Sequence, residues 1–140
     1  MSRDHSQLIL GCEHVLPEGG LQKKCELNRP LRIKAGFDPT AADLHLGHAV
    51  LFKKLADFQQ QGHQVIVIIG DYTARIGDPS GRNTTRPPLT TEAIEANAKT
   101  YEEQLFAWLD PNKTEIQYNS SWYNAIDLSE MIGLCSRVTV

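Results

Sequence analysis

The chain has 140 residues, about the length of one domain, and its hydrophobic fraction of 41% supplies one ordinary core, which argues against global disorder. Its 14 lysines and arginines against 17 aspartates and glutamates give a net charge of -3. That balance lacks the excess positive charge of a dedicated nucleic-acid-binding protein.

The cysteine pattern and the apolar stretches narrow the class of protein further. The chain has three cysteines, an odd number, and they are widely spaced: Cys12, Cys25 and Cys135. This pattern disfavours a zinc or redox site and is typical of reduced thiols in the cytosol. MSRDHSQLIL at the N-terminus lacks the features of a signal peptide, and VIVII at 65–69 is too short to span a membrane. We therefore expect a cytoplasmic protein with no membrane partner and no metal site.

We expect residues 1–30 to form an N-terminal helical segment. QLILGCEHVL at 7–16 is weakly helical. Pro17 suits a first helical position, so a second short helix is predicted from there through Leu27.

A strand, a helix and a second strand are expected between residues 31 and 69. Apolar and charged residues alternate in LRIKA at 31–35, as they do in a strand. From Gly47 to Gln61 apolar residues recur at helical spacing, and Gly62 is placed to end that helix. QVIVIIG at 64–70 is an almost continuous β-branched run, typical of a strand covered on both faces. This order predicts a βαβ unit with parallel strands.

The alternation of helices and strands continues to the end of the chain. Residues 70–89 are rich in Gly, Pro, Ser and Thr, and a loop of this length in a compact domain is usually functional. A helix with a threonine cap is predicted over 90–109 and a third strand over 114–118, and LSEMIGLC at 128–135 is expected to begin another helix. Residues 31–140 are therefore expected to form an α/β domain, a Rossmann-like parallel sheet with flanking helices.

Two histidines, His45 and His48, flank Gly47 in DPTAADLHLGH at 38–48, between the first strand and its helix. Such a pair is often only part of a surface or a core, and a metal site is disfavoured because no third ligand stands at suitable spacing. The position favours an anion site, since free N–H groups and the positive end of the helix dipole meet there. Gly47 would leave room for a flat base, and both imidazoles could donate hydrogen bonds to a phosphate.

The same stretch carries a resemblance to a known family. GFDPTAADLHLGH at 36–48 resembles the first signature of the class I aminoacyl-tRNA synthetases, the His-Ile-Gly-His motif. GFDPT, then FQQQGHQVIVIIGD at 58–71 and IGDPSGRNTTRPPLT at 76–90, are similar to bacterial tyrosyl-tRNA synthetases in order and spacing. The resemblance implies that residues 31–140 are a partial, truncated catalytic domain, the first half of a class I synthetase nucleotide-binding fold.

The resemblance also implies a reaction and its partners. The family activates L-tyrosine with ATP to form tyrosyl-adenylate and pyrophosphate, then transfers the tyrosyl group to tRNA(Tyr). ATP is thus an expected substrate, accompanied by Mg²⁺, with no tightly bound cofactor. The family forms homodimers, and most of its tRNA contacts lie in regions that this chain lacks.

Site residues follow by matching motif positions. Those implied to bind ATP are Gly36, Asp38, Thr40, His45, Gly47 and His48. Among them, Thr40 and His45 are implied to meet the phosphates, whereas Gly47 and His48 are implied to lie on the adenosine side. Thr40, His45 and His48 are also expected to be catalytic.

The tyrosine and pyrophosphate sites involve other residues. Asp78 resembles the carboxylate that holds the tyrosine ammonium group, although an aspartate before a proline is also a common turn residue. Arg82 and Arg86 are implied to clasp the pyrophosphate as catalytic residues, the alternative being solvated loop charges. The best-known members carry a tyrosine where this chain has Lys34, so the substrate hydroxyl needs a different reader; Lys34 and Asp71 are the residues we expect there.

Nothing in the chain is similar to the lysine-rich second signature of the family, Lys-Met-Ser-Lys-Ser. We therefore expect an N-terminal fragment of a tyrosine-tRNA ligase with little activity of its own. Two other functions stay open: another nucleotidyltransferase with the same histidine signature, or a non-catalytic fragment that self-associates through an exposed apolar face.

Overall fold

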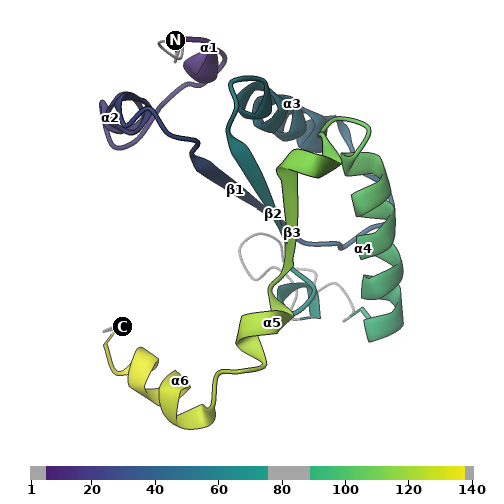
Figure 1. Cartoon of the computed structure of the whole chain (residues 1–140). Helices are drawn as coiled ribbons and strands as arrows, with labels where there is room; N and C mark the ends of the chain where they lie inside the picture. The colour runs from purple at the N-terminus through teal and green to yellow at the C-terminus, as the bar shows by residue number, and fades with distance from the viewer. Residues whose placement is uncertain (1–5, 76–88, 138–140) are drawn as a thin grey trace.

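The computed structural model describes residues 6–75 and 89–137, whose centre is a parallel sheet of three strands. The strands β1 (Arg32–Phe37), β2 (Gln64–Ile69) and β3 (Thr114–Tyr118) lie side by side in that order. Ile33 pairs with Val65, and Val67 pairs with Ile116. Because all three strands run in one direction, their carboxyl ends meet at one edge of the sheet (Figure 1). The expected βαβ unit and the Rossmann-like parallel sheet are confirmed.

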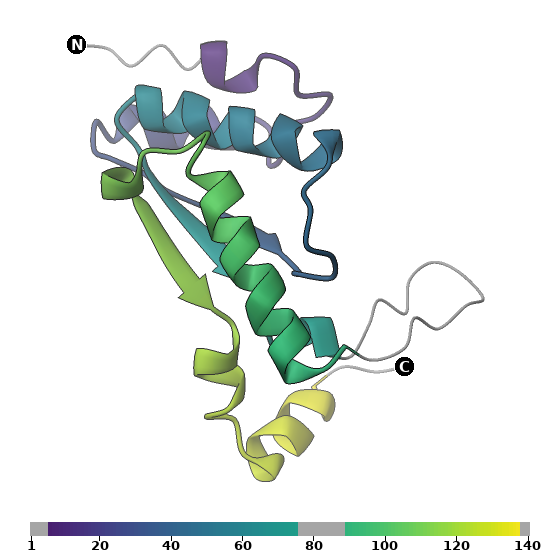
Figure 2. The same ribbon diagram turned by 90° about the vertical axis from the view of Figure 1, so that its right-hand side faces the viewer.

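Both long helices cover the same face of the sheet. The helix α3 (Leu46–Gln60) connects β1 to β2, and α4 (Thr91–Leu105) precedes β3 (Figure 2). Alternate strand residues face these helices, because successive side chains in a strand point to opposite faces. The resulting core comprises Phe37, Phe52, Leu55, Val65, Val67, Ile69, Ala98, Tyr101, Leu105 and Leu109. Each fully buried valine, leucine, isoleucine or phenylalanine among them stabilises the fold by about 1.5–3 kcal/mol.

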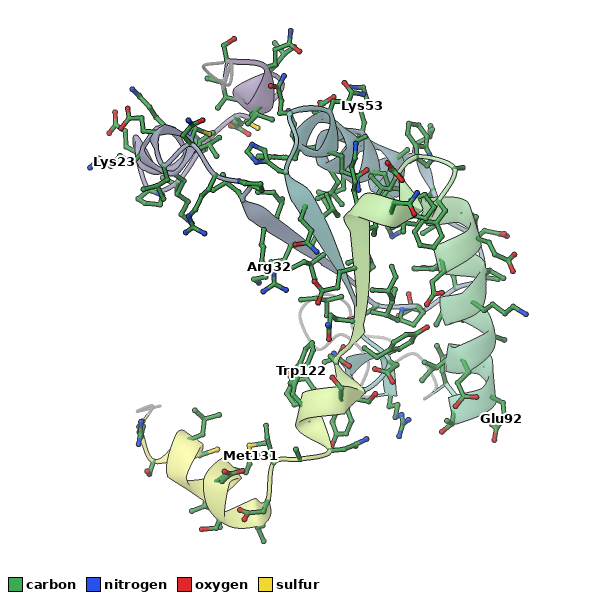
Figure 3. All side chains as sticks on the ribbon, in the orientation of Figure 1. Lys23, Arg32, Lys53, Glu92, Trp122 and Met131 are labelled. Carbon is green, nitrogen blue, oxygen red and sulfur yellow. The ribbon has the colours of Figure 1, made fainter. Side chains whose placement is uncertain are left out.

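The opposite face of the sheet is more polar. Arg32, Lys34 and Gly36 of β1 are exposed, and Figure 3 places Arg32 on the side away from α4. Its guanidinium lies 3.0 Å from a carboxylate oxygen of Glu115, so the ion pair spans β2. On this face of β2, Ile66 is buried and Ile68 is half-buried. The predicted burial of β2 on both faces is therefore complete only on the helical side.

The N-terminal segment differs from the prediction in the length of its helices. The helix α1 spans Ser6–Ile9 rather than 7–16, and α2 spans Gly20–Glu26 rather than starting at Pro17. Gly11 and Gly19 have φ angles of +78° and +68°, a left-handed conformation that interrupts a right-handed helix. The segment packs on the rest of the chain through a small cluster of Leu8, Cys25 and Leu31.

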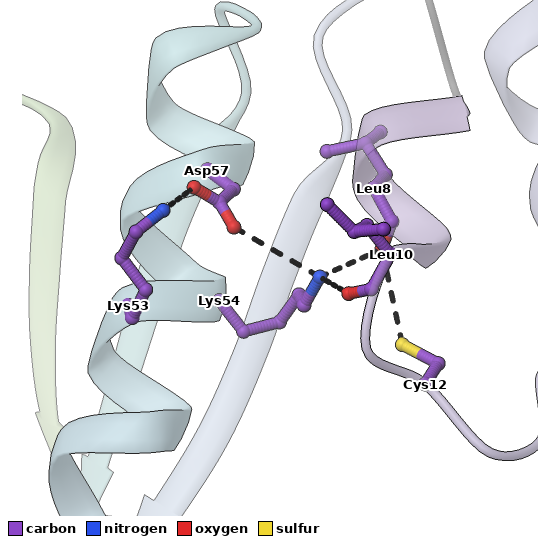
Figure 4. A network of polar contacts seen from close by, with 6 residues as sticks. All are labelled: Leu8, Leu10, Cys12, Lys53, Lys54 and Asp57. Carbon is purple, nitrogen blue, oxygen red and sulfur yellow. Dashed lines mark hydrogen bonds and ion pairs between the residues drawn. The ribbon is translucent and has the colours of Figure 1, made fainter.

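A lysine of α3 holds the end of α1 (Figure 4). Lys54 Nζ donates to the carbonyl oxygens of Leu8 at 3.2 Å and Leu10 at 2.7 Å, and it lies 3.9 Å from an Asp57 carboxylate oxygen. The last carbonyls of a helix have no partner within the helix, so a cation placed there satisfies them. The other lysine in Figure 4, Lys53, pairs with the same Asp57 carboxylate and does not touch α1.

Replacing Lys54 with methionine is expected to loosen the N-terminal segment while sparing the sheet. The variant keeps the apolar stem and loses the donated hydrogen bonds, which costs about 1 kcal/mol at this partly exposed site. Amide hydrogen exchange should then speed up about fivefold around Leu8 and Leu10, with no change in β2. Lys53→Met is the matched control, and an equal effect from it would contradict the role assigned to Lys54.

The remaining elements are short. The 3₁₀ turns η1 (Thr73–Arg75) and η2 (Pro111–Lys113) and the helix α5 (Ser120–Tyr123) were not anticipated from the sequence. The last helix, α6 (Leu128–Cys135), begins where it was predicted to begin, with a reciprocal cap between Asp127 and Glu130. In the described parts of the chain, no helix combines the length and the apolar character needed to span a bilayer.

Candidate functional site

The first turn of α3 is built around the two histidines. His45 is the residue that caps the helix, in an extended conformation with φ -112° and ψ 172°. Its Nδ1 accepts a hydrogen bond from Gly47 N–H at 3.1 Å, and His48 Nδ1 accepts one from His45 N–H at 3.2 Å. The pair forms a reciprocal capping box, so each imidazole satisfies a backbone donor that the helix itself cannot.

These contacts determine which nitrogen of each ring carries the proton. A nitrogen that accepts a hydrogen bond has no proton, so the neutral tautomer of both rings carries its hydrogen on Nε2. The ring centroids are 4.0 Å apart, and the planes are tilted by 36°. The first turn of α3 therefore carries two imidazoles whose Nε2–H donors are not used by these backbone contacts, beside the positive end of a helix dipole. Uncharged donors in that position suit an anion whose charge increases during a reaction.

His48 lies between the helix and the core. Its ring centroid is 6.1 Å from that of Phe37, 6.4 Å from that of Phe52 and 5.9 Å from that of Tyr101. Burial, and then the electrostatic interaction with His45, lower the pKa of His48 below its ordinary value of 6.5. His48 is therefore neutral at pH 7, as its acceptor role requires.

The lowered pKa of His48 gives the stability of the chain a pH dependence. The unfolded chain binds the His48 proton more readily than the folded chain, so folding is favoured fully above pH 6.5 and less as the pH falls below that value. Protonation of Nδ1 also removes the acceptor for His45 N–H. We expect urea unfolding to show a free energy of unfolding that decreases as the pH falls below 6.5.

A matched variant isolates this contribution. His48→Asn keeps an acceptor close to the position of Nδ1 and removes the titrating group. The decrease in stability on acidification should be smaller in this variant than in the unaltered chain. Equal decreases would show that other groups account for the pH dependence.

Gly47 has a structural reason to be a glycine. A Cβ atom at this position would lie 2.9 Å from Cε1 and 3.0 Å from Nδ1 of the His45 ring. The absent side chain thus allows the imidazole to lie against the first turn and accept from Gly47 N–H. Whether the same space also admits a base stays a prediction.

A second group of polar side chains joins the carboxyl ends of the three strands. Asp38 follows β1, and its Oδ1 accepts from Thr73 Oγ1 at 2.8 Å. Thr73 Oγ1 in turn accepts from Asn119 Nδ2 at 2.9 Å, and Asn119 Oδ1 accepts from Tyr72 N–H at 2.8 Å. Asn119 is only 5% exposed, so its side chain is a buried link between the loops after β2 and β3.

Sequence reasoning missed Thr73 and Asn119. The available signal was their place in the chain, since each closely follows a predicted strand and ligands bind outside the carboxyl ends of parallel strands. Asp71, which was predicted, accepts a hydrogen bond from Ser120 N–H at 3.0 Å and so supports the start of α5.

The structure brings some predicted site residues together and separates others. Asp38, His45, Gly47, His48 and Asp71 follow the carboxyl ends of β1 and β2. In the same loop as Asp38, Thr40 is exposed and donates its N–H to the Asp38 carbonyl oxygen at 2.8 Å.

Lys34 and Gly36 lie along β1 itself, on the face that α3 and α4 do not cover, where they pair with Ile66 and Ile68. Asp78, Arg82 and Arg86 lie outside the described residues. Within residues 6–75 and 89–137, no group of three or more potential ligands is arranged to hold a metal ion.

Comparison with known proteins gives a consistent result. Residues 26–140 match the family model described as tRNA synthetases class I (W and Y). The chain is 60% identical over 130 residues to the tyrosine-tRNA ligase of Aromatoleum aromaticum. This alignment covers 93% of the chain and 33% of the relative. It is 58% identical over 140 residues to the tyrosine-tRNA ligase of Nitratidesulfovibrio vulgaris. This alignment covers 100% of the chain and 35% of the relative. The chain thus spans about a third of the length of these curated relatives.

Solved structures resemble the chain in fold. The tyrosyl-tRNA synthetase of Archaeoglobus fulgidus, solved with L-tyrosine, has a TM-score of 0.72 and 25% identity, over 96% of this chain and 41% of that one. The tyrosyl-tRNA synthetase of Aeropyrum pernix has the same TM-score of 0.72 at 17% identity, over 96% of this chain and 39% of that one, which establishes likeness of fold alone.

Proposed function

The chain belongs to the class I tRNA synthetases of the tryptophan and tyrosine type, and we propose that it supplies the ATP site and part of the amino-acid site of a tyrosine-tRNA ligase. The observation that carries this proposal is the reciprocal cap at the start of α3. There His45 and His48 keep their Nδ1 atoms on the backbone and offer Nε2–H donors to an anion.

ATP is proposed to bind with its phosphates at this helix terminus. Thr40 and His45 contact the phosphates, and Gly47 and His48 lie on the adenosine side. Gly36 and Asp38 line the adjoining wall. These assignments draw support from the shared position of Asp38, His45 and His48 at the carboxyl edge of the sheet. Mg²⁺ is proposed to arrive with ATP, because it neutralises phosphate charge.

The reaction then needs little covalent work from the protein. The carboxylate of L-tyrosine attacks the α-phosphorus of ATP, the bond from that phosphorus to the bridging oxygen breaks, and pyrophosphate leaves. Negative charge grows on the departing group, where the hydrogen bond from His45 Nε2–H strengthens. Arg82 and Arg86 are proposed to hold the pyrophosphate, and the fixed placement of both reactants supplies much of the remaining acceleration.

L-Tyrosine is proposed to lie along the exposed face of β1. Lys34 and Gly36 share that face, and Asp71 stands at the end of the neighbouring strand. Asp78 is proposed to hold the substrate ammonium group through charge-assisted hydrogen bonds. Lys34 or Asp71 then reads the tyrosine hydroxyl. A polar site of this kind rejects phenylalanine, because the missing hydroxyl leaves polar groups of the site without a partner once the substrate covers them; tyrosyl-tRNA synthetase is itself a well-known example of such discrimination.

Transfer to tRNA(Tyr) is proposed for the whole enzyme and is supported by the family and by the names of the curated relatives. Homodimer formation and a cytoplasmic location are proposed from the sequence resemblance alone.

Pyrophosphate exchange tests the proposed function. This chain would replace the matching residues of the Nitratidesulfovibrio vulgaris relative, to which it aligns over its whole length, to give a hybrid enzyme. We expect the hybrid to exchange pyrophosphate into ATP with L-tyrosine and not with L-tryptophan or L-phenylalanine. Exchange that prefers another amino acid would contradict the proposal.

A further inference from the structure

Three side chains of α4 reach across to the loop that carries the proposed phosphate contacts, residues 38–45. Asn97, Thr100 and Gln104 are spaced three and four residues apart, so they share one face of the helix. Asn97 Nδ2 donates to the Pro39 carbonyl oxygen at 3.0 Å, and Thr100 Oγ1 donates to that of Ala42 at 2.8 Å.

Gln104 uses both ends of its amide on the same loop. Its Nε2 donates to the Ala42 carbonyl oxygen at 3.0 Å, and its Oε1 accepts from Leu44 N–H at 3.1 Å. The same Nε2 lies 3.1 Å from the Thr100 carbonyl oxygen, which ties the amide to its own helix. Gln104 therefore holds the peptide groups on either side of Asp43, one through its carbonyl oxygen and the other through its N–H.

This contact acts immediately before the helix cap. Leu44 precedes His45, whose extended backbone and Nδ1 contact start α3. From the position after Thr100, the ring of Tyr101 meets that of His48 edge-on at 5.9 Å between centroids. Side chains of α4 thus bind the backbone of the loop and also contact the imidazole ring of His48.

We propose that Gln104, assisted by Thr100 and Asn97, is a positioning residue that sets the loop and His45 for the phosphates of ATP. The inference rests on the proposed function for its ligand. A loop without secondary structure samples many conformations, and each one that misplaces His45 reduces binding and rate. Hydrogen bonds from a helix anchored in the core remove that freedom before ATP arrives.

These three side chains are separate from the packing that holds α4 on the sheet. That packing is made by Ala98, Tyr101 and Leu105, which are all buried. Removal of the Gln104 amide should therefore change the loop and leave the sheet unchanged. A role confined to general stability would instead affect β2 and the loop together.

The test compares Gln104→Met with Glu103→Met in the 140-residue chain. Both replacements are alike, and Glu103 is an exposed neighbour on α4. Two quantities are measured for each variant: the rates of amide hydrogen exchange and the dissociation constant for Mg·ATP. Because two hydrogen bonds to the loop are lost, Gln104→Met should speed Leu44 exchange and weaken Mg·ATP binding, each about tenfold. Exchange in β2 should not change, and Glu103→Met should match the unaltered chain.

A third variant adds a pH signature. Gln104→Glu introduces a carboxyl group that, when protonated, reproduces the amide donor and acceptor and, when ionised, repels the Ala42 carbonyl oxygen. Its affinity for Mg·ATP relative to the unaltered chain should recover as the pH falls from 7 towards 5. A purely structural side chain would give no such recovery.

The outcomes separate this inference from the proposed function. Mg·ATP binding by the unaltered chain, with Leu44 exchange and affinity unchanged in Gln104→Met, would overturn the inference and leave the function in place. If the unaltered chain binds no Mg·ATP, the function and the nucleotide role of Gln104 are both overturned. Should Gln104→Met fail to fold, Thr100→Val removes one of the two donors to Ala42, and unchanged Leu44 exchange there would count against the inference.

Discussion

Replacement of His45 with alanine in the hybrid enzyme is expected to slow tyrosyl-adenylate formation by about 10²–10³-fold. Under the proposed function, the Nε2–H donor of His45 stands at the helix terminus where charge would grow on the departing pyrophosphate. A donor aimed at developing charge contributes more to the transition state than to the ground state. The loss should therefore fall on the rate of the chemical step, measured by single-turnover formation of the adenylate, and less on the affinity for ATP.

Alanine at this position also removes a helix cap, so a second variant is needed. His45→Asn keeps an oxygen close to the position of Nδ1, where it accepts from Gly47 N–H, and it lacks the Nε2–H donor. Both variants should lose the rate, whereas only His45→Ala should also lose about 1 kcal/mol of stability in urea unfolding. A fast asparagine variant would show that His45 acts only as a cap.

Replacement of Gly70 with alanine is expected to disrupt the network at the carboxyl edge of the sheet. A Cβ atom there would lie 1.8 Å from Asp38 Oδ1 and 2.5 Å from Thr73 Oγ1, so both side chains must move. Overpacking of this kind costs about 1–3 kcal/mol. The displaced Asp38 and Thr73 can then no longer keep their hydrogen bond, so binding of Mg·ATP to the chain should weaken as well.

Gly36→Ala is the matched control for stability. The atom nearest to a Cβ at Gly36 is the Ile68 carbonyl oxygen at 3.9 Å, an ordinary contact distance, and the site is exposed. Urea unfolding should therefore show a loss for Gly70→Ala and almost none for Gly36→Ala. Equal stabilities of the two variants would mean that the space beside Gly70 is not restrictive.

The elements that follow from local patterns were predicted well. The spacing of apolar residues that indicates β1, α3 and β2 can be seen within short stretches of consecutive residues. Thr90 caps α4 by accepting a hydrogen bond from Ala93 N–H, as expected. The prediction for α4 failed only at its end, which is Leu105 and not Leu109. Leu109 is still buried, at 2% exposure, so the apolar pattern continues after the helical backbone has stopped.

Contacts between distant segments could not be predicted in this way. Thr73 meets Asp38 across 35 positions of the sequence, and Gln104 meets Leu44 across 60. Threonine and glutamine are common surface residues, and nothing in their neighbours indicates a partner. The histidine pair was easier to find, because its two members and the helix start that they cap lie within four residues.

Titration of the 140-residue chain with Mg·ATP, followed by ¹H–¹⁵N spectra, tests most directly whether the start of α3 is a phosphate site. The amides of Gly47 and His48 and the Nε2 resonances of both histidines should shift first, and GTP should shift them less. Joint replacement of His45 and His48 with asparagine should abolish the response without unfolding the chain. Shifts confined to another part of the chain, or an undiminished response in the double variant, would contradict a nucleotide site at these two histidines.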